Sequence, residues 1–370
     1  MTTPLRIVLD VRATTAHFPG VARATLGLLQ GLCSVAHPHE IIALTEAGVA
    51  PTRDADYSQV AYVATQAGPL SAQQQWALPL LARRLRPDVW HAPYYIRPFI
   101  GVPRPIVTVF DLIGHIVPDA LPSLRARLLF ELTLRLSVRR AVHIITSSQA
   151  TRRDLIDVLR LDPSTITVVP LAADDRFAPQ STTQEATVRE RYGLNKRYLL
   201  YLGSNKPHKN IALLVRAFAR LDTDVSLVIA GRWDERYNEP KQLVHTLDLN
   251  QRVRFIHDIA DADVPALLSG ALAFVFPSRY EGFGLPPLEA MACGTPVIAT
   301  ATSSLPEVVG DAGVLVKPEA VALRNAMQMV LGDAALRQQL RQKGLTRAAQ
   351  FSWRSTAEQT LVVYERVART

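Results

Sequence analysis

The stretch that decides the fold reads FPSRYEGFGLPPLEAMACGTPVI and covers residues 276–298. The residues that lead into it, 272–276, form an apolar run typical of a buried strand. Two glycines and two prolines follow, and then Leu-Glu-Ala-Met-Ala, a good helix-forming segment. Proline is tolerated in the first turn of a helix, and Gly294 with Pro296 would end it. Because Val297 begins another apolar run, the stretch predicts a strand, a glycine loop, a helix and a strand.

A loop of this kind can bind an anion. It lies at the carboxyl end of a strand and opens a helix, where free N–H groups and the positive helix end point outward. Glu281 lies in the loop, and Glu289 lies eight residues later, inside the helix. Since carboxylates accept hydrogen bonds from hydroxyls, the two could hold hydroxyl-rich groups on either side of a phosphate. Gly282 and Gly284 taken alone would favour simple turn chemistry.

The whole constellation resembles the donor-site signature of the family 4 glycosyltransferases, E-G-F-G-L-P-x-L-E-A-M-A-C-G-x-P-V. The resemblance implies that Glu281 lies beside the transferred sugar and that Glu289 holds the ribose of the nucleotide. It also implies that the loop binds the nucleotide diphosphate, mainly through backbone amides, with the residues Gly282, Phe283, Gly284 and Leu285.

Two other loops resemble parts of the same family's donor site. Residues 203–210 read GSNKPHKN, similar to the family's Gly-x-x-x-Pro-x-Lys-Asn turn. Lys209 matches the lysine that neutralises the diphosphate, and Lys206 is a plausible substitute for an arginine that some members carry near Ser204. Near the N-terminus, Gly20-Val21-Ala22-Arg23 resembles the family's Gly-Ile-Gly-Arg loop without its second glycine. Gly20 is therefore a candidate donor contact, with a plain strand-to-helix turn as the alternative.

A further candidate follows the apolar run 106–110. Polar groups directly after a buried parallel strand are where α/β active sites form. The family often has His-Asp-Leu here, with the histidine beside the transferred sugar. This chain has Phe110 at the histidine position and retains Asp111, which we take as a candidate catalytic residue. His115 either returns to the site from four residues on or is a loop histidine without a role.

An arginine-rich helix is expected over residues 121–140. Its arginines gather mainly on one side, within about 140° of arc at 100° per residue; that side holds Arg125, Arg135, Arg139 and Arg140. The simpler interpretation is a packed helix with a solvated arginine face. The alternative is an interfacial helix for an anionic membrane or for a lipid-phosphate acceptor.

Length and composition indicate two ordinary globular domains. A chain of 370 residues exceeds one comfortable core. Hydrophobic content of 48% and charged content of 20% are typical of globular proteins. We expect an α/β protein with the GT-B fold of the resembled family, two doubly wound Rossmann-like domains facing a central cleft. The domains expected are 1–178 and 179–351, with a linker in the polar stretch 179–187 and a C-terminal helix, 352–370, crossing back to the first domain.

Several classes of protein are disfavoured. The net charge of +8 is shared between both halves, and no basic stripe with interleaved aromatics indicates nucleic acid. No apolar run is long enough for a membrane span, and no signal peptide is recognisable. Two cysteines suit free thiols in a reducing cytoplasm. Asp-x-Asp pairs occur at 54/56, 222/224 and 261/263, but helix capping explains the last, so neither a metal site nor a cofactor is expected.

The resemblance therefore implies a retaining, metal-independent glycosyltransferase that uses a nucleotide diphosphate sugar. Lys209, Lys206 and the start of the helix at Gly284 would stabilise the leaving diphosphate, and Glu281 would position the sugar. Mannose from GDP-mannose is the expected donor sugar, and a glycan or lipid-linked acceptor in bacterial polysaccharide synthesis is the expected partner. Work in the cytoplasm is expected, with possible contact to the inner face of an anionic membrane. A GT-B epimerase and a non-catalytic sugar-nucleotide-binding subunit remain as alternatives.

Overall fold

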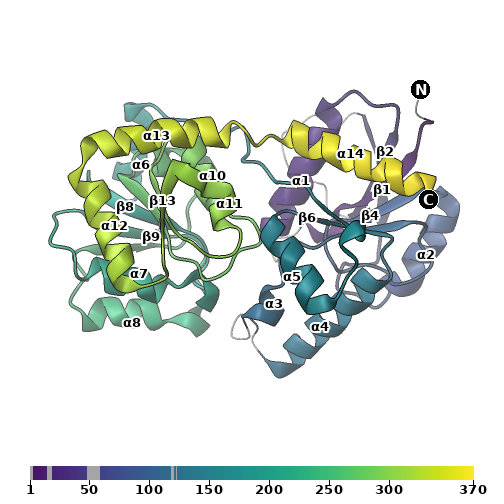
Figure 1. The fold of residues 1–370 in the computed structure, drawn as a ribbon, viewed down its shortest axis with the longest axis horizontal. Coiled ribbons are helices and arrows are strands. Elements are labelled where there is room, and N and C mark those ends of the chain that lie inside the picture. Colours follow the sequence, from purple (N-terminus) through teal and green to yellow (C-terminus); the bar gives the residue numbers. More distant parts are fainter. Residues whose placement is uncertain (1–2, 15–18, 48–58, 118–120, 122) are drawn as a thin grey trace. The chain divides into compact units, whose positions relative to one another are not determined.

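Figure 1 shows the computed structural model, which describes residues 3–14, 19–47, 59–117, 121 and 123–370. The chain forms two compact units. Unit 1 comprises Met1–Ala172 with Ser352–Thr370, and unit 2 comprises Ala173–Phe351.

The polar stretch 179–187, expected as the linker, lies inside unit 2. Ser181 there accepts a hydrogen bond from the backbone N–H of Gln184 and caps helix α6 (Thr182–Arg191), while the Gln184 side chain accepts from the backbone N–H of Ser181. The linker prediction was wrong because serine and glutamine, common in linkers, here form a capping box at a helix start.

Unit 1 is built on a seven-stranded parallel sheet in the order β3-β2-β1-β4-β5-β6-β7. Its strands are β1 (Arg6–Asp10), β2 (Glu40–Glu46), β3 (Val60–Thr65), β4 (Val89–Ala92), β5 (Pro105–Thr108), β6 (His143–Thr146) and β7 (Ile166–Val168). Ile7 of β1 lies opposite Ile41 of β2 on one side and Val89 of β4 on the other. Strands β4 to β6 are fully buried, as expected for a parallel sheet covered by helices.

The helices of unit 1 include the last helix of the chain. They are α1 (Pro19–Ser34), α2 (Gln74–Leu85), α3 (Ile113–Ile116), α4 (Leu124–Arg139), α5 (Gln149–Leu159) and α14 (Trp353–Arg369). Helix α14, yellow in Figure 1, packs against α1. A Cβ atom at Gly27 would lie 2.2 Å from the Trp353 ring, and one at Gly31 would lie 2.2 Å from the Trp353 carbonyl oxygen. Glycine at these two positions therefore allows the close approach of the two helices.

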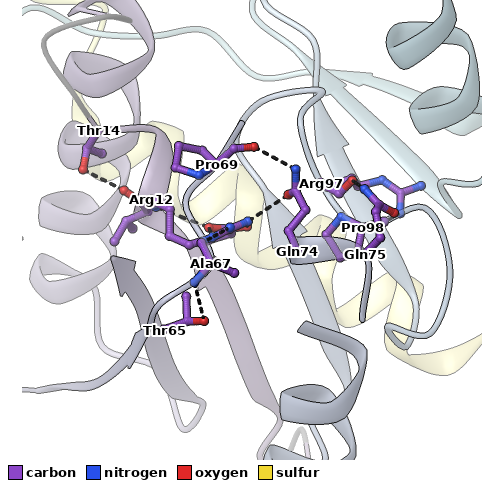
Figure 2. A network of polar contacts seen from close by, with 11 residues as sticks. Arg12, Thr14, Thr65, Ala67, Pro69, Gln74, Gln75, Arg97 and Pro98 are labelled. Atoms are coloured by element: carbon purple, nitrogen blue, oxygen red, sulfur yellow. Dashed lines mark hydrogen bonds and ion pairs between the residues drawn. The ribbon is translucent and has the colours of Figure 1, made fainter. Parts of the chain in front are cut away.

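A buried ion pair fixes the carboxyl end of β1. The Arg12 guanidinium lies 2.6 Å from the Asp10 carboxylate, and both side chains are buried. Arg12 also donates to the carbonyl oxygen of Ala67 at 2.7 Å and to Gln74 Oε1 at 3.2 Å (Figure 2). Burial of a charge pair is costly unless its hydrogen-bonding groups have partners. Here Asp10, Ala67 and Gln74 supply partners for Arg12. The pair therefore ties β1 to the segment that leads into α2.

Unit 2 has a six-stranded parallel sheet in the order β10-β9-β8-β11-β12-β13. Its strands are β8 (Tyr198–Leu202), β9 (Ser226–Ala230), β10 (Val253–Ile256), β11 (Ala273–Phe276), β12 (Val297–Thr300) and β13 (Gly313–Val316). Besides α6, its helices are α7 (Ile211–Phe218), α8 (Glu239–Thr246), α9 (Val264–Ser269), α10 (Leu285–Ala292), α11 (Leu305–Val309), α12 (Ala320–Gly332) and α13 (Ala334–Ala348). Strand β11, helix α10 and strand β12 confirm the order expected for residues 272–298.

Two buried histidines of unit 1 are held in the neutral form. His91 Nδ1 lies 2.7 Å from the Tyr364 hydroxyl of α14, and Nε2 lies 2.8 Å from the Thr108 hydroxyl. Burial lowers the pKa of His91 to about 3. Burial, together with the nearby Arg366, lowers the pKa of His143 to about 4. Because neutral imidazole has one donor and one acceptor, His91 is satisfied by two hydroxyls without a charge.

We predict that acid destabilises the protein well above pH 4. Both histidines stay neutral in the folded protein but become protonated near pH 6.5 in the unfolded chain. The free energy of unfolding should therefore be fully retained above pH 6.5 and fall as the pH drops, by about 2 kcal/mol at pH 5 from His91 alone. Urea unfolding between pH 7 and 5 measures this. His91→Gln should flatten the slope, whereas replacing the exposed His245 with Gln should not; an unchanged slope in both variants would contradict the assignment.

Candidate active site

The donor-type loops of unit 2 meet at one edge of its sheet. From β8 the chain runs outward through β9 and β10, and it then returns to β11 on the other side of β8. In open parallel sheets, ligands bind outside the carboxyl ends of the strands at such a reversal. The loop after β8, residues 203–210, and the loop after β11, residues 277–284, flank this point.

Lys209 and Glu281 are in direct contact there. Lys209 Nζ lies 2.7 Å from Glu281 Oε1, and the two side chains are only 15% and 12% exposed. Lys209 Nζ also lies 5.2 Å from the ring centre of Phe276, the last residue of β11. A mostly buried ammonium therefore sits between a carboxylate and the face of an aromatic ring, both of which favour positive charge.

The loop that carries Glu281 is held by residues that follow β12. The backbone N–H of Glu281 donates to Ser303 Oγ at 2.8 Å. Ser304 Oγ donates to the carbonyl oxygens of Glu281 at 2.9 Å and Phe283 at 2.6 Å. These serines were not among the site residues expected from the sequence. Their position directly after a parallel strand was the available signal, since all such strands end at the same edge.

Gly284 is the N-cap of α10, and its φ of +117° favours glycine. A Cβ atom at this position would also lie 2.9 Å from Leu305 Cδ2. The Phe283 side chain is buried and makes an edge contact with Phe351, with ring centres 5.9 Å apart. Phe283 is thus suited to offer a ligand its backbone and not its side chain. Gly282 is partly buried beside it, and Leu285, also partly buried, opens the helix.

Glu289 lies within α10 and is only 2% exposed. The side chain of Glu281, by comparison, is 12% exposed. Its negative charge adds to burial in raising the pKa of the Cys293 thiol to about 12. The two glutamates of the expected donor signature therefore occupy different environments, one at the ion pair and one in the interior of the unit.

Internal hydrogen bonds hold the loop after β8. The Tyr201 hydroxyl donates to the carbonyl oxygen of Ser204 at 2.7 Å. The Asn205 side chain donates to the carbonyl oxygens of Asp234 and Tyr237, and its Oδ1 accepts from the N–H of Asp234 at 2.7 Å. Lys206 in the same loop is exposed. The backbone that carries both lysines is thus fixed by buried partners.

His208 and Arg279 lie at the same edge, and neither was expected from the sequence. The N–H of Arg279 donates to the His208 carbonyl oxygen at 2.8 Å, and its guanidinium donates to that of Pro207 at 3.2 Å. Burial, with the charges of Lys209, Lys206 and Arg279, holds the pKa of His208 well below its usual value. His208 is therefore neutral, and the three neighbouring cations make the site attractive to an anion.

The candidates of unit 1 lie after β4 and β5. Asp111 Oδ1 accepts from the N–H of Ile113 at 2.9 Å. The hydroxyls of Tyr94 and Tyr95 lie 3.2 Å apart. Burial raises the pKa of Tyr95 to about 12 and raises the pKa of Tyr94 well above its usual value, and the negative charge of Asp111 contributes to both. Asp111 thus shares its surroundings with two tyrosines to which the sequence assigned no role.

Phe110, at the position of the family histidine, lines a cavity of about 20 Å³ together with His91, Thr108 and Ser147. His115 Nδ1 lies 3.0 Å from Glu131 of α4. This pairing favours a structural role for His115 over a return to the site. Gly20 is exposed in the first turn of α1, and no atom of the described residues lies within 4 Å of where its Cβ would be.

Within the part of the chain that the structure describes, no three acidic, histidine or cysteine side chains gather as metal ligands would. Asp263 is paired with Arg191 at 2.6 Å, and Asp224 with Arg197 at 2.8 Å. The pair at 54/56 lies outside the described residues.

Comparison with known proteins places these features in a family. A family model described as Glycosyl transferases group 1 matches residues 184–347, and one described as Glycosyltransferase Family 4 matches residues 19–177. The chain is 33% identical over 299 residues to O-antigen chain mannosyltransferase B of Escherichia coli, covering 79% of this chain and 77% of that protein. It is 30% identical over 245 residues to the serotype-specific mannosyltransferase WbdA of Escherichia coli, covering 62% of this chain but only 29% of WbdA.

Solved structures share the fold. Sucrose-phosphate synthase from Thermosynechococcus elongatus superimposes with a TM-score of 0.77 at 23% identity, covering 98% of this chain and 99% of that one. HepE from Anabaena, solved in complex with UDP-glucose, superimposes with a TM-score of 0.77 at 19% identity, covering 97% of this chain and 99% of HepE. The two Rossmann-like units with parallel sheets have the GT-B fold, and the family matches identify a glycosyltransferase of this class. The chain belongs to glycosyltransferase family 4, as the resemblance in its sequence implied.

We predict opposite effects of Lys209 and Glu281 on nucleoside diphosphate binding. If Lys209 binds the diphosphate, as the family resemblance implies, Lys209→Ala should weaken GDP or UDP binding by roughly 1.5–3 kcal/mol, because one charge-assisted contact is lost. Glu281→Gln removes the carboxylate that competes for the same ammonium, so affinity should be kept or rise a few-fold. Calorimetry on both variants measures this.

The double variant Lys209→Ala/Glu281→Gln is the matched control, because Lys209→Ala alone leaves a mostly buried carboxylate unpaired. It should bind as weakly as Lys209→Ala. Equal losses in Glu281→Gln and Lys209→Ala would mean that the pair acts as one structural unit and not as competing ligands.

Proposed function

We propose that the protein is a retaining, metal-independent mannosyltransferase that moves mannose from GDP-mannose to a glycan or lipid-linked acceptor in bacterial polysaccharide synthesis. Membership of family 4 supports glycosyl transfer, and two relatives are named as mannosyltransferases of O-antigen or serotype-specific polymers. The observation that carries the proposal is the Lys209–Glu281 pair at the carboxyl ends of β8 and β11, beside the start of α10. This arrangement suits an anionic diphosphate joined to a hydroxyl-rich sugar.

In the proposed reaction, the bond between the sugar C1 and the diphosphate oxygen breaks, and the diphosphate keeps the electron pair. Lys209, Lys206 and the backbone amides of residues 283–285 would stabilise the charge that develops on it, which is electrostatic catalysis without a metal. Glu281 would accept hydrogen bonds from sugar hydroxyls. The acceptor hydroxyl would attack C1 from the face that the diphosphate leaves and pass its proton to a phosphate oxygen, so the configuration at C1 is retained.

The acceptor would be bound by unit 1. Asp111 and the hydroxyls of Tyr94 and Tyr95 form a polar group after β4 and β5, where ligands of parallel sheets bind. We assign Asp111 to a hydrogen bond with the acceptor hydroxyl, and Gly20 and Ser204 to backbone contacts with the donor. A lipid-linked acceptor would place the enzyme in the cytoplasm at the inner face of the membrane.

A second candidate function rests on Phe110. A side chain without a polar group, at the position where the family often has a histidine, suits a non-catalytic sugar-nucleotide-binding subunit. An epimerase would need acid and base groups flanking the sugar carbon, and Phe110 supplies neither.

One experiment separates these functions. The protein is incubated with labelled GDP-mannose, UDP-glucose and other nucleotide sugars, with a polysaccharide or lipid-linked acceptor and excess EDTA. We expect label to pass from GDP-mannose to the acceptor and chelation to leave the rate unchanged. Binding without transfer would favour the subunit, and conversion of the sugar would favour an epimerase. Activity lost with EDTA and restored by Mn²⁺ or Mg²⁺ would overturn metal independence.

Substitution of Glu289 and of Glu281 should change the kinetics in different ways. Glu289→Gln weakens the hold on the ribose, which is remote from bond breaking, so it should raise the donor KM more than it lowers kcat. Glu281→Gln acts at the sugar, where positive charge develops, so it should lower kcat more than it changes nucleoside diphosphate binding. Steady-state kinetics with calorimetry measure both. The reverse pattern would exchange the two roles.

A further inference from the structure

The outer face of α4 exposes an unusual amount of apolar surface. Its leucines recur about every four residues, and four of them are more than half exposed: Leu124 (77%), Leu128 (71%), Leu129 (66%) and Leu132 (57%), with Leu136 at 36%. The sequence alone did not separate these from the leucines that pack inward. A contiguous exposed apolar patch on a globular protein commonly marks a binding surface.

Arginines lie among these leucines. At 100° per residue, the five leucines and the arginines Arg125, Arg135, Arg139 and Arg140 all fall within about 160° of arc. Of these four arginines, Arg135 alone has a carboxylate partner within the described residues, Glu131 at 2.6 Å. The face thus combines apolar side chains with cations that are free to meet anions.

We propose that this face of α4 docks on a bilayer of anionic lipid. Leucines inserted at the headgroup boundary would leave water, and arginines can extend their long side chains to the phosphates. The charge argues against pairing with a second copy of the same face, because a two-fold contact would oppose arginines to arginines. The proposal deepens the proposed function, since it names the surface on which a lipid-linked acceptor would be met.

The inner face of α4 is joined to the segments that carry the candidate acceptor residues. The rings of Phe130 on α4 and Tyr95 make an edge contact, with centres 5.2 Å apart. Buried Arg97 donates to the carbonyl oxygen of Ser137 at 2.7 Å, and His115 pairs with Glu131. A helix docked on lipid would therefore hold the segments after β4 and β5, including Asp111, close to that surface.

Vesicle binding tests the proposal and needs neither donor nor turnover. The protein is sedimented with vesicles of phosphatidylcholine alone and of phosphatidylcholine mixed with phosphatidylglycerol, over a range of salt. We expect binding to the anionic vesicles that weakens as salt rises. Because this readout is independent of transfer, a failed activity assay would not affect it. No binding to either vesicle would overturn the proposal and leave a solvated face.

Variants separate the contribution of the leucines to vesicle binding from that of the arginines. Leu128→Gln/Leu132→Gln should lower the partition coefficient by about tenfold or more. Arg125→Gln/Arg139→Gln should lower it by about tenfold and flatten the salt dependence. The matched controls are Val321→Gln/Val362→Gln, which alters exposed apolar residues of α12 and α14, and Arg220→Gln/Lys317→Gln, which alters exposed cations of unit 2. Both controls should bind as the parent does.

Two further measurements check the folding of the variants and the alternative of self-association. Circular dichroism should show that every variant melts as the parent does, because the altered side chains are exposed. Binding that survives the leucine variant would overturn insertion of α4. Concentration-dependent self-association that the leucine variant abolishes, measured by sedimentation velocity without lipid, would assign the face to a second copy and also overturn the proposal.

Discussion

The parallel pairing of β8 with β11 is the constraint on which the candidate site of unit 2 depends. The two strands are neighbours in the sheet, although two other strands separate them in the chain. Their pairing brings Lys209 and Glu281, 72 residues apart, within 2.7 Å. Several hydrogen bonds hold the two loops that carry these residues. Ser303 and Ser304 fix the loop of Glu281, and Asn205 fixes the loop of Lys209. The backbone conformation of Gly284 lets α10 start directly after the loop of Glu281.

Much of this edge was predictable from the sequence, because the signal was a long contiguous pattern. Residues 276–298 indicated a strand, a glycine loop and a helix, and the structure has β11, α10 and β12 there. The contact between Lys209 and Glu281 was not predictable, since the resemblance assigned each to a ligand and not to the other. Arg279, His208 and the two serines were missed for a similar reason. Each is a single residue whose role depends on which strands become neighbours.

Two other expectations show the limits of composition. The stretch 179–187 has the serine, threonine and glutamine typical of a linker, yet the same residues cap and begin α6. On α4 the leucines occur around the whole helix, so periodicity could not tell which of them pack inward. The structure shows that Leu134 and Val138 are buried while Leu124 and Leu128 are exposed. Which face of a helix is covered depends on its neighbours in the fold, and one sequence does not reveal them.

Unit 1 is completed by the end of the chain, and this has a consequence for biogenesis. Trp353 of α14 packs against Gly27 and Gly31 of α1, and Tyr364 of α14 forms a hydrogen bond with His91. Residues 352–370 leave the ribosome only after all of unit 2 has been made. Unit 2 is continuous and can fold as it emerges, whereas unit 1 must wait with part of its core uncovered. During synthesis, unit 1 is therefore begun before unit 2 and completed after it.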